Sequence, residues 1–279
     1  MESIRLSCPS LPRAETRQRE FLGLRWTLCV AACLAALAPA LCRAQQAKAG
    51  PKIYVAPSEV PSMLSGMLLA LGNRLQSPGK EQIVLTGVLA DAASRSPVQL
   101  VSQLGGKLRL EWTGVPGKVL SFDGKTATTQ SGKFSAEDAD LLESLVDDTP
   151  ETLLETVAQG ASFRFLGRGF PDPEAGACDL VDIFQRPKTQ ALAQPRGKRY
   201  CFDSRTALLH YVRYQEGAGS GAPLVETRLE DWRSVNGQMI PGRITRTQDG
   251  KEVFQFQAQQ VAVAVGAPDS LFGAGAVQD

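Results

Sequence analysis

The chain has 279 residues, with 30 basic and 29 acidic side chains, a formal net charge of +1 and a single histidine. So balanced a charge excludes the clustered positive surface with which proteins bind nucleic acid. One histidine excludes most of the common catalytic and zinc-binding arrangements. We expect no nucleic-acid partner, no metal and no cofactor.

The first 44 residues have the pattern of a cleavable secretory signal. A positively charged stretch precedes the uncharged run 26–41, and Cys42-Arg43-Ala44 places a small residue at the point of cleavage. The positive charges are Arg13, Arg17, Arg19 and Arg25. The uncharged run contains Pro39 and is shorter than the roughly 20 apolar residues of a transmembrane helix, so a retained anchor is the less favoured alternative. We expect an exported protein, periplasmic or elsewhere in the cell envelope, with no transmembrane segment after cleavage.

Cleavage after Ala44 leaves 24 basic and 26 acidic side chains, in a chain long enough for one large domain or two small ones. Val30-Ala31-Ala32-Cys33 resembles a lipobox, but it lies too early in the apolar run for lipidation to be favoured. Residues 45–57 contain small residues and proline and are expected to form a linker.

Cysteine usage agrees with export. Four of the six cysteines lie in the expected signal, and only Cys178 and Cys201 remain in the mature chain. An oxidising compartment favours a disulfide between such a pair. Two buried free thiols are the alternative, because spacing alone does not establish geometry.

A helix is expected from Ser58 to about Gln76, where Ser77-Pro78-Gly79 ends it. Its apolar residues recur at the spacing of one helix face: Val60, Met63, Leu64, Met67, Leu68 and Leu71. We expect this face to pack against a sheet.

Strands begin beyond Lys80, first with the run 83–89, which is apolar on both faces. Residues 107–112 then alternate without a fault, which places Leu108, Leu110 and Trp112 on one face. The charged residues between them, Lys107, Arg109 and Glu111, are expected to face water. Asp123-Gly124 stands between two short strand-like runs, 119–122 and 125–128, and indicates a hairpin.

A helical interruption is expected over residues 135–160. Ser135 is its N-cap, and Thr149-Pro150-Glu151 starts a second helix with proline in the first position. The expected apolar positions are Leu141, Leu142, Leu145, Val146, Leu153, Leu154 and Val157. The many acidic residues of this segment are expected to form a solvated helical face.

Strands resume after Ser162, with breaks expected at Pro171-Asp172-Pro173 and again near 194–197 and 216–223. The strand-like runs are 162–168, 178–186, 198–203, 207–215, 224–235, 239–248 and 252–265. Asn236-Gly237 and Asp249-Gly250 are hairpin dipeptides and imply antiparallel neighbours. With the helical segments, the fold class is α+β, mainly antiparallel β.

Residues that could carry catalysis are scarce. His210 lies in an alternating strand, where a satisfied structural histidine is favoured over a general base. Asp179 and Asp182 fall on opposite faces of a regular strand, and the acidic residues near 226–231 alternate with arginines as on an outer face. We therefore expect no catalytic residue and no enzyme, with an envelope hydrolase as the least favoured alternative.

The apolar strand faces are the strongest candidates for a functional site. They would line a hydrophobic ligand cavity if the space beneath the helices is open, and a plain core if it is filled. The candidate cavity residues are Leu108, Leu110, Trp112, Phe163, Phe165, Phe254 and Phe256.

Several motifs resemble those of a known family. The segment Glu230-Asp231-Trp232-Arg233-Ser234-Val235-Asn236-Gly237-Gln238-Met239-Ile240-Pro241 and the ending Pro268-Asp269-Ser270-Leu271-Phe272 are similar to the closing strands of LolA/LolB-like lipoprotein-sorting proteins. Gly106-Lys107-Leu108-Arg109-Leu110 and Phe122-Asp123-Gly124-Lys125 resemble the central strands of that family. The resemblance covers residues 58–272 and leaves 273–279 as a C-terminal tail.

The resemblance implies a curved half-barrel sheet with helices covering its concave face and a cavity for acyl chains. We therefore expect an envelope protein that binds lipid or lipoprotein acyl chains, with a role in lipoprotein sorting and with envelope proteins as further partners. The alternative is a sensor or interaction domain of the same fold with a closed core.

Overall fold

The computed structural model describes residues 59–72, 81–103, 106–130, 134–173, 176–185, 188–189, 196–217, 221–265 and 269–273. The expected signal, the linker and residues 274–279 lie outside these ranges. None of the described helices is both long and apolar enough to cross a membrane.

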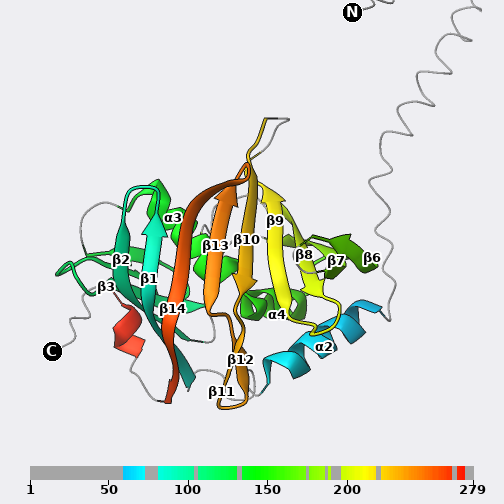
Figure 1. Ribbon diagram of the computed structural model, residues 1–279, viewed down its shortest axis with the longest axis horizontal. Coiled ribbons are helices and arrows are strands. Elements are labelled where there is room, and N and C mark those ends of the chain that lie inside the picture. The colour runs from blue at the N-terminus through cyan, green and yellow to red at the C-terminus, as the bar shows by residue number, and fades with distance from the viewer. Residues whose placement is uncertain are drawn as a thin grey trace, which may run out of the picture. The chain divides into compact units, whose positions relative to one another are not determined.

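One antiparallel sheet of twelve strands dominates the region from Ile53 to Asp279 (Figure 1). Its strands lie in the order β5-β4-β3-β2-β1-β14-β13-β10-β9-β8-β7-β6, with different strands at the two edges, so the sheet is open. The strands are β1 (Glu81–Asp91), β2 (Arg95–Gln103), β3 (Lys107–Trp112), β4 (Val119–Phe122), β5 (Ala127–Thr129), β6 (Phe163–Asp172), β7 (Gly176–Gln185), β8 (Arg196–Asp203), β9 (Leu209–Gln215), β10 (Leu224–Glu230), β13 (Arg243–Gln248) and β14 (Lys251–Val265). The expected α+β class, mainly antiparallel, is confirmed.

The pairing of β1 with β14 joins two arms of the sheet that are far apart in sequence. Leu85 lies opposite Val261, and Leu89 lies opposite Phe256. A bulge at Gly87 interrupts this register, and a Cβ atom there would lie 2.1 Å from the Gln257 carbonyl oxygen. Only glycine allows the two backbones to approach so closely.

The predicted hairpins are confirmed. Asn236 and Gly237 have φ angles of 51° and 74° and connect a small separate ribbon, β11 (Arg233–Val235) and β12 (Gln238–Ile240). Asp249 and Gly250 have φ angles of 50° and 75° and connect β13 to β14. Two successive positive φ angles are the signature of the turn that matches strand twist.

Helices lie on one face of the large sheet, which we call the inner face (Figure 1). They are α2 (Glu59–Leu71), α3 (Ala136–Leu142), the π-helical turn η2 (Glu143–Asp147) and α4 (Pro150–Ala158). Ser135 and Asp138 form a capping box at the start of α3. Helix α4 starts with Pro150 as expected, and the Thr149 hydroxyl caps it. Helix α2 ends at Leu71 rather than near Gln76, because Gly72 bends away and bridges to Gln238.

Some expected strand boundaries are wrong. Strand β2 has no counterpart among the predicted strands, and β6 continues through the expected break as far as Asp172. The predicted strand 224–235 is divided between β10 and β11 at Asp231, whose φ angle is 53°. The predicted strand 239–248 is likewise divided between β12 and β13.

One charged residue of β3 does not face water as predicted. Arg109 is buried on the outer face, where the C-terminal turn η3 (Asp269–Phe272) covers it. The Arg109 guanidinium forms an ion pair with Glu111 at 3.0 Å and donates to the Leu271 carbonyl oxygen. Strand alternation placed Arg109 on the correct face, but a segment 162 residues away determines its burial.

Cys178 on β7 and Cys201 on β8 form the expected disulfide, with their Cα atoms 5.3 Å apart. Both residues are buried. The bond closes a loop across a sequence separation of 23 residues, which stabilises the fold by about 3 kcal/mol if it acts on the entropy of the unfolded chain.

Candidate functional site

Two apolar clusters occupy the inner face beneath the helices. The first contains five of the predicted cavity residues, Leu108, Leu110, Trp112, Phe254 and Phe256, all buried with the apolar residues of α3 and η2. The second lies on β7 to β10 under α2 and α4, and the remaining two, Phe163 and Phe165, pack against it half-buried. The structure therefore divides the predicted wall into two groups.

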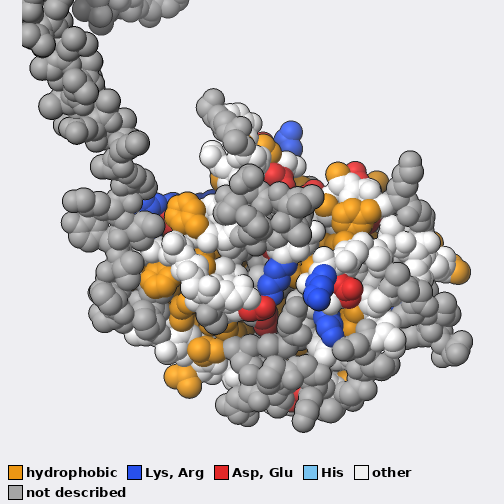
Figure 2. All heavy atoms as spheres, turned by 180° about the vertical axis from the view of Figure 1, so that it is seen from behind, with side chains coloured by type: hydrophobic (Ala, Val, Ile, Leu, Met, Phe, Trp, Pro, Cys, Tyr) orange, Lys and Arg blue, Asp and Glu red, His pale blue; other side chains and the backbone are white. Residues whose placement is uncertain are grey.

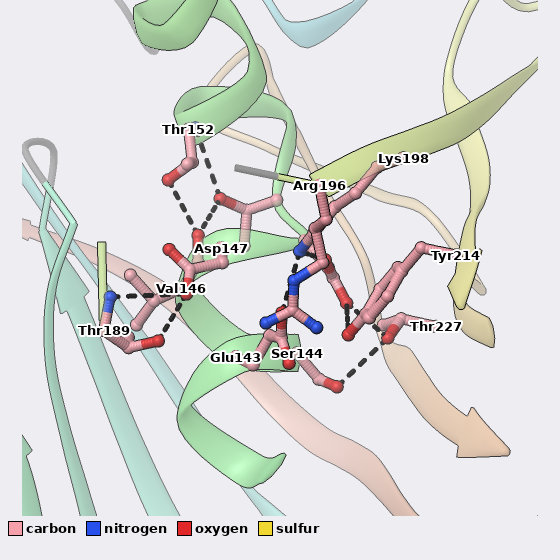
Figure 3. Close-up of polar contacts among 12 residues, drawn as sticks. Glu143, Ser144, Val146, Asp147, Thr152, Thr189, Arg196, Lys198, Tyr214 and Thr227 are labelled. Atoms are coloured by element: carbon pink, nitrogen blue, oxygen red, sulfur yellow. Dashed lines mark hydrogen bonds and ion pairs between the residues drawn. The ribbon is translucent and has the colours of Figure 1, made fainter. Parts of the chain in front are cut away.

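A set of charged and hydroxyl-bearing side chains lies between the helical segment around η2 and the sheet (Figure 3). We call it the ionic network, and it consists of Glu143, Ser144, Asp148, Arg196, Lys198, Tyr214, Thr227 and Arg246. Viewed from the helical side, basic and acidic side chains gather near the middle, with apolar side chains on both sides of them (Figure 2).

The π-helical turn supplies the acidic side of this network. All five residues of η2 are buried, and Asp148 directly after it is buried too. The wider turn of η2 is closed by the Asp148 amide, which donates to the Glu143 carbonyl oxygen at 2.9 Å. The expectation that the acidic residues here form a solvated face is therefore wrong for Glu143, Asp147 and Asp148.

Lys198 supplies the central positive charge. Its Nζ atom lies 3.1 Å from Glu143 Oε1 and 2.6 Å from Asp148 Oδ1, and all three side chains are fully buried. The ammonium also lies 4.3 Å from the centre of the Tyr214 ring. A buried charge without such partners would cost several kcal/mol, so the three residues depend on one another.

Two arginines complete the ion pairs. Arg246 is 1% exposed and contacts Asp140 at 3.0 Å and Glu143 at 3.7 Å. Arg196 contacts Glu143 at 3.0 Å, so three cations surround that one carboxylate.

Hydroxyl groups surround the second carboxylate oxygen of Asp148. Thr227 donates to Asp148 Oδ2 at 2.6 Å, and its hydroxyl lies 3.0 Å from that of Ser144. The Arg246 guanidinium donates to the Tyr214 hydroxyl at 3.0 Å. Together with the ion pairs of Lys198, these bonds connect η2 and the adjoining Asp148 to β8, β9, β10 and β13.

Asp147 points away from this network toward the chain beyond β7. Its carboxylate accepts from the Lys188 amide at 2.8 Å and from the Thr189 hydroxyl. Burial raises the pKa of Asp147, as it raises the pKa of Asp140 and of Glu216.

The pKa of each central group reflects a contest between burial and charge. Burial alone would raise the pKa of Glu143, but the positive charges around it hold that pKa below its usual value. Burial would likewise lower the pKa of Lys198, whereas Asp148 and Glu143 raise it. Lys198 therefore stays protonated, and a protonated, buried amine is unsuited to act as a general base.

Stability should fall steeply above about pH 10. Burial raises the pKa of Tyr200 and of Tyr214 well above 10.0, and the pKa of Lys198 lies above its ordinary 10.5. Above these ordinary values the folded protein keeps protons that the unfolded chain has released, so each group adds a slope of up to about −1.4 kcal/mol per pH unit. Urea unfolding between pH 8 and 11 measures it, and Tyr200→Phe should make the alkaline slope shallower. An unchanged slope in that variant would contradict the assignment.

Two hollows are described, and neither is lined by any of the seven predicted cavity residues. One, of about 50 Å³, lies where η2 and α4 meet β1, β2 and β3. The other, of about 540 Å³, opens over β7 to β10 beside Arg199 and Arg213. Within the described ranges, no group of three or more His, Cys, Asp and Glu side chains could hold a metal ion.

Sequence alternation contained a signal for the ionic network. Lys198 shares a strand face with Tyr200 and Phe202, which are buried, so a cation on that face needs a buried partner. His210, by contrast, is half-buried on β9 outside the network, and its Nε2 atom has no hydrogen-bond partner among the described residues.

No model of a known protein family matches this sequence, and no curated protein matches it. Solved structures do resemble the fold. A LolA superfamily protein from Nitrosomonas europaea superimposes with a TM-score of 0.51 at 12% identity, covering 77% of this chain and 97% of that protein. A putative outer membrane lipoprotein-sorting protein domain from Vibrio parahaemolyticus gives 0.48 at 12% identity, over 75% and 95% of the two chains. This chain has the LolA-like fold, a curved open sheet with helices on one face.

Proposed function

We propose that this protein is an exported envelope protein that binds acyl chains of lipids or lipoproteins on the inner face of its sheet. The observation that carries the proposal is the apolar inner face beneath a helical cover, in a chain with the LolA-like fold. Each methylene buried there would contribute about 0.8 kcal/mol, so a single acyl chain needs only part of this surface. The protein acts by binding rather than by catalysis.

Entry of the acyl chain is proposed at the second cluster. Phe163 and Phe165 are only half-buried there, whereas the first cluster is closed by the apolar residues of α3 and η2. The ionic network holds η2 in place, so α4 and α2 are the parts of the cover that an acyl chain would displace.

Phe165→Glu should weaken the binding of a fluorescent fatty acid at least tenfold. A carboxylate on this partly buried face would repel the fatty-acid headgroup or cost free energy on burial beside an acyl chain. Phe170→Glu is the matched control, because Phe170 lies on the same strand with 41% of its surface exposed. Both variants should keep the wild-type melting temperature within a few degrees, because neither side chain is fully buried.

Native mass spectrometry of protein purified from its own envelope tests the proposal independently of variants. Co-purifying lipid supports it. A consistently empty protein that also takes up no fluorescent fatty acid would overturn it. That result would favour the second candidate, an interaction or sensor domain whose inner face is a closed core, which agrees with the burial of the first cluster.

A further inference from the structure

A row of charged side chains crosses the outer face of the sheet, opposite the helices. Arg164 on β6 lies opposite Asp182 on β7, and Asp182 lies opposite Arg199 on β8. Arg199 lies opposite Arg213 on β9, and Arg213 lies opposite Glu226 on β10. Directly opposed residues of neighbouring strands share a face, so these five side chains form one continuous row.

Each carboxylate in this row is shared by two arginines. Asp182 accepts from Arg164 at 2.5 Å and from Arg199 Nε at 2.8 Å. Glu226 accepts from Arg213 Nε and from Arg228 Nε, each at 2.5 Å. The four arginines and two carboxylates leave an excess of two positive charges.

The middle of the row places two like charges side by side. Arg199 and Arg213 are directly opposed on β8 and β9, and their mutual repulsion is offset in part by Asp182 and Glu226 on either side. Their side chains are 43% and 36% exposed. Their ion pairs use Nε and Nη2, and the Arg213 guanidinium also lies 4.6 Å from the centre of the Tyr211 ring. Among the described residues, neither Nη1 forms a hydrogen bond or an ion pair.

The hollow of about 540 Å³ opens above this pair. Two exposed apolar side chains border it, Phe184 at 47% and Leu224 at 43%. The Phe184 ring lies over Gly197, where a Cβ atom would be 3.1 Å from the ring. The hollow therefore offers the two exposed guanidinium groups of Arg199 and Arg213 next to apolar side chains.

We propose that this hollow binds the phosphate group of an anionic phospholipid, with Arg199 and Arg213 donating to the phosphate oxygens and Phe184 and Leu224 contacting the adjacent apolar part. Guanidinium groups match phosphate geometry, and the bound anion would neutralise the opposed charges. Arg199 and Arg213 lie on the outer face of the sheet, opposite the proposed acyl-binding face, while Arg196 and Tyr214 of the ionic network also line the hollow. The proposed phosphate site does not depend on acyl binding.

Binding is measured with three probes: dispersed dihexanoyl-phosphatidylglycerol, vesicles of phosphatidylglycerol and phosphatidylcholine, and inorganic phosphate. The short-chain lipid should bind at least tenfold more tightly than inorganic phosphate, because phosphate lacks the apolar contacts. Vesicles that contain phosphatidylglycerol should bind, and pure phosphatidylcholine vesicles should not.

Arg199→Gln and Arg213→Gln should each weaken phosphatidylglycerol binding at least tenfold. Either change leaves the shared carboxylate with its second arginine, so the fold should be retained. Arg205→Gln is the control with the same change of charge, at a side chain that is 83% exposed and outside the hollow. Fluorescent fatty-acid uptake should be unchanged in all three variants.

Equal binding of dihexanoyl-phosphatidylglycerol by wild type, Arg199→Gln and Arg213→Gln would overturn the proposal. So would a wild-type protein that binds inorganic phosphate as tightly as the lipid, or that binds neither. Because fatty-acid uptake is measured in the same variants, failure of this site is distinguishable from failure of the proposed acyl-binding face.

Discussion

Lys198→Met should lower the free energy of unfolding by about 3 to 5 kcal/mol, the range for breaking a buried ion pair on one side only. Methionine keeps the length and most of the volume of the side chain, so the effect reports on charge rather than on a cavity. Without the ammonium, Glu143 loses one of its three cations and Asp148 loses its only described ion pair. Arg196 and Arg246 would still neutralise Glu143 in part.

Urea unfolding at pH 7 measures the loss, with Arg205→Met as the matched control. Arg205 is largely exposed and lies 3.6 Å from Asp203, and its replacement should change stability by no more than about 0.5 kcal/mol. Adding Asp148→Asn to Lys198→Met should restore part of the loss, because the orphaned carboxylate is then removed. A loss below about 1 kcal/mol for Lys198→Met would show that the ionic network does not hold η2 on the sheet.

Leu110→Glu should unfold the protein at 25 °C, the larger of the two effects. Leu110 is fully buried in the first cluster between Leu100 on β2 and Leu120 on β4. Loss of a buried leucine costs about 2 to 5 kcal/mol, and the buried carboxylate adds a further penalty, which together approach the whole stability of a typical domain. Circular dichroism and thermal melting measure the outcome.

Val115→Glu is the control, since this valine lies in the turn after β3 with 48% of its surface exposed. It should melt like the wild type. A folded Leu110→Glu protein of unchanged melting temperature that has lost fatty-acid binding would instead show that the first cluster is a ligand wall. The same folded variant with wild-type lipid affinity would contradict the inward assignment of Leu110 altogether.

Strand alternation, turn dipeptides and helix-start residues depend on neighbours in the sequence, so the sequence was sufficient to predict the elements that they define. The alternation of residues 107–112, the Asn-Gly and Asp-Gly turns, the cap at Ser135 and the helix start at Pro150 are all found as expected. Strand β2 was not predicted. It contains Pro97, a residue that argues against a strand in the sequence but is tolerated near a strand's start.

Burial of charge could not be predicted in the same way. The acids of η2 have the spacing of a solvated helix, and their partners Lys198 and Arg246 follow about 50 and 100 residues later. Only the folded sheet brings these charges together. Strand alternation predicted that the seven candidate cavity side chains face inward, but it did not predict that they belong to two clusters rather than one.

The pairing of β1 with β14 has a consequence for the order of folding. Because the chain is synthesised from its N-terminus, β1 to β5 are made first. One edge of β1 then has no partner until β14 has been made. That edge presents unpaired backbone groups, and the strand contains the apolar residues Ile83, Leu85 and Leu89; such a strand pairs readily with other chains. So many distant contacts also slow folding. We therefore expect a newly made chain to be most prone to aggregation through this edge before its C-terminal residues are made.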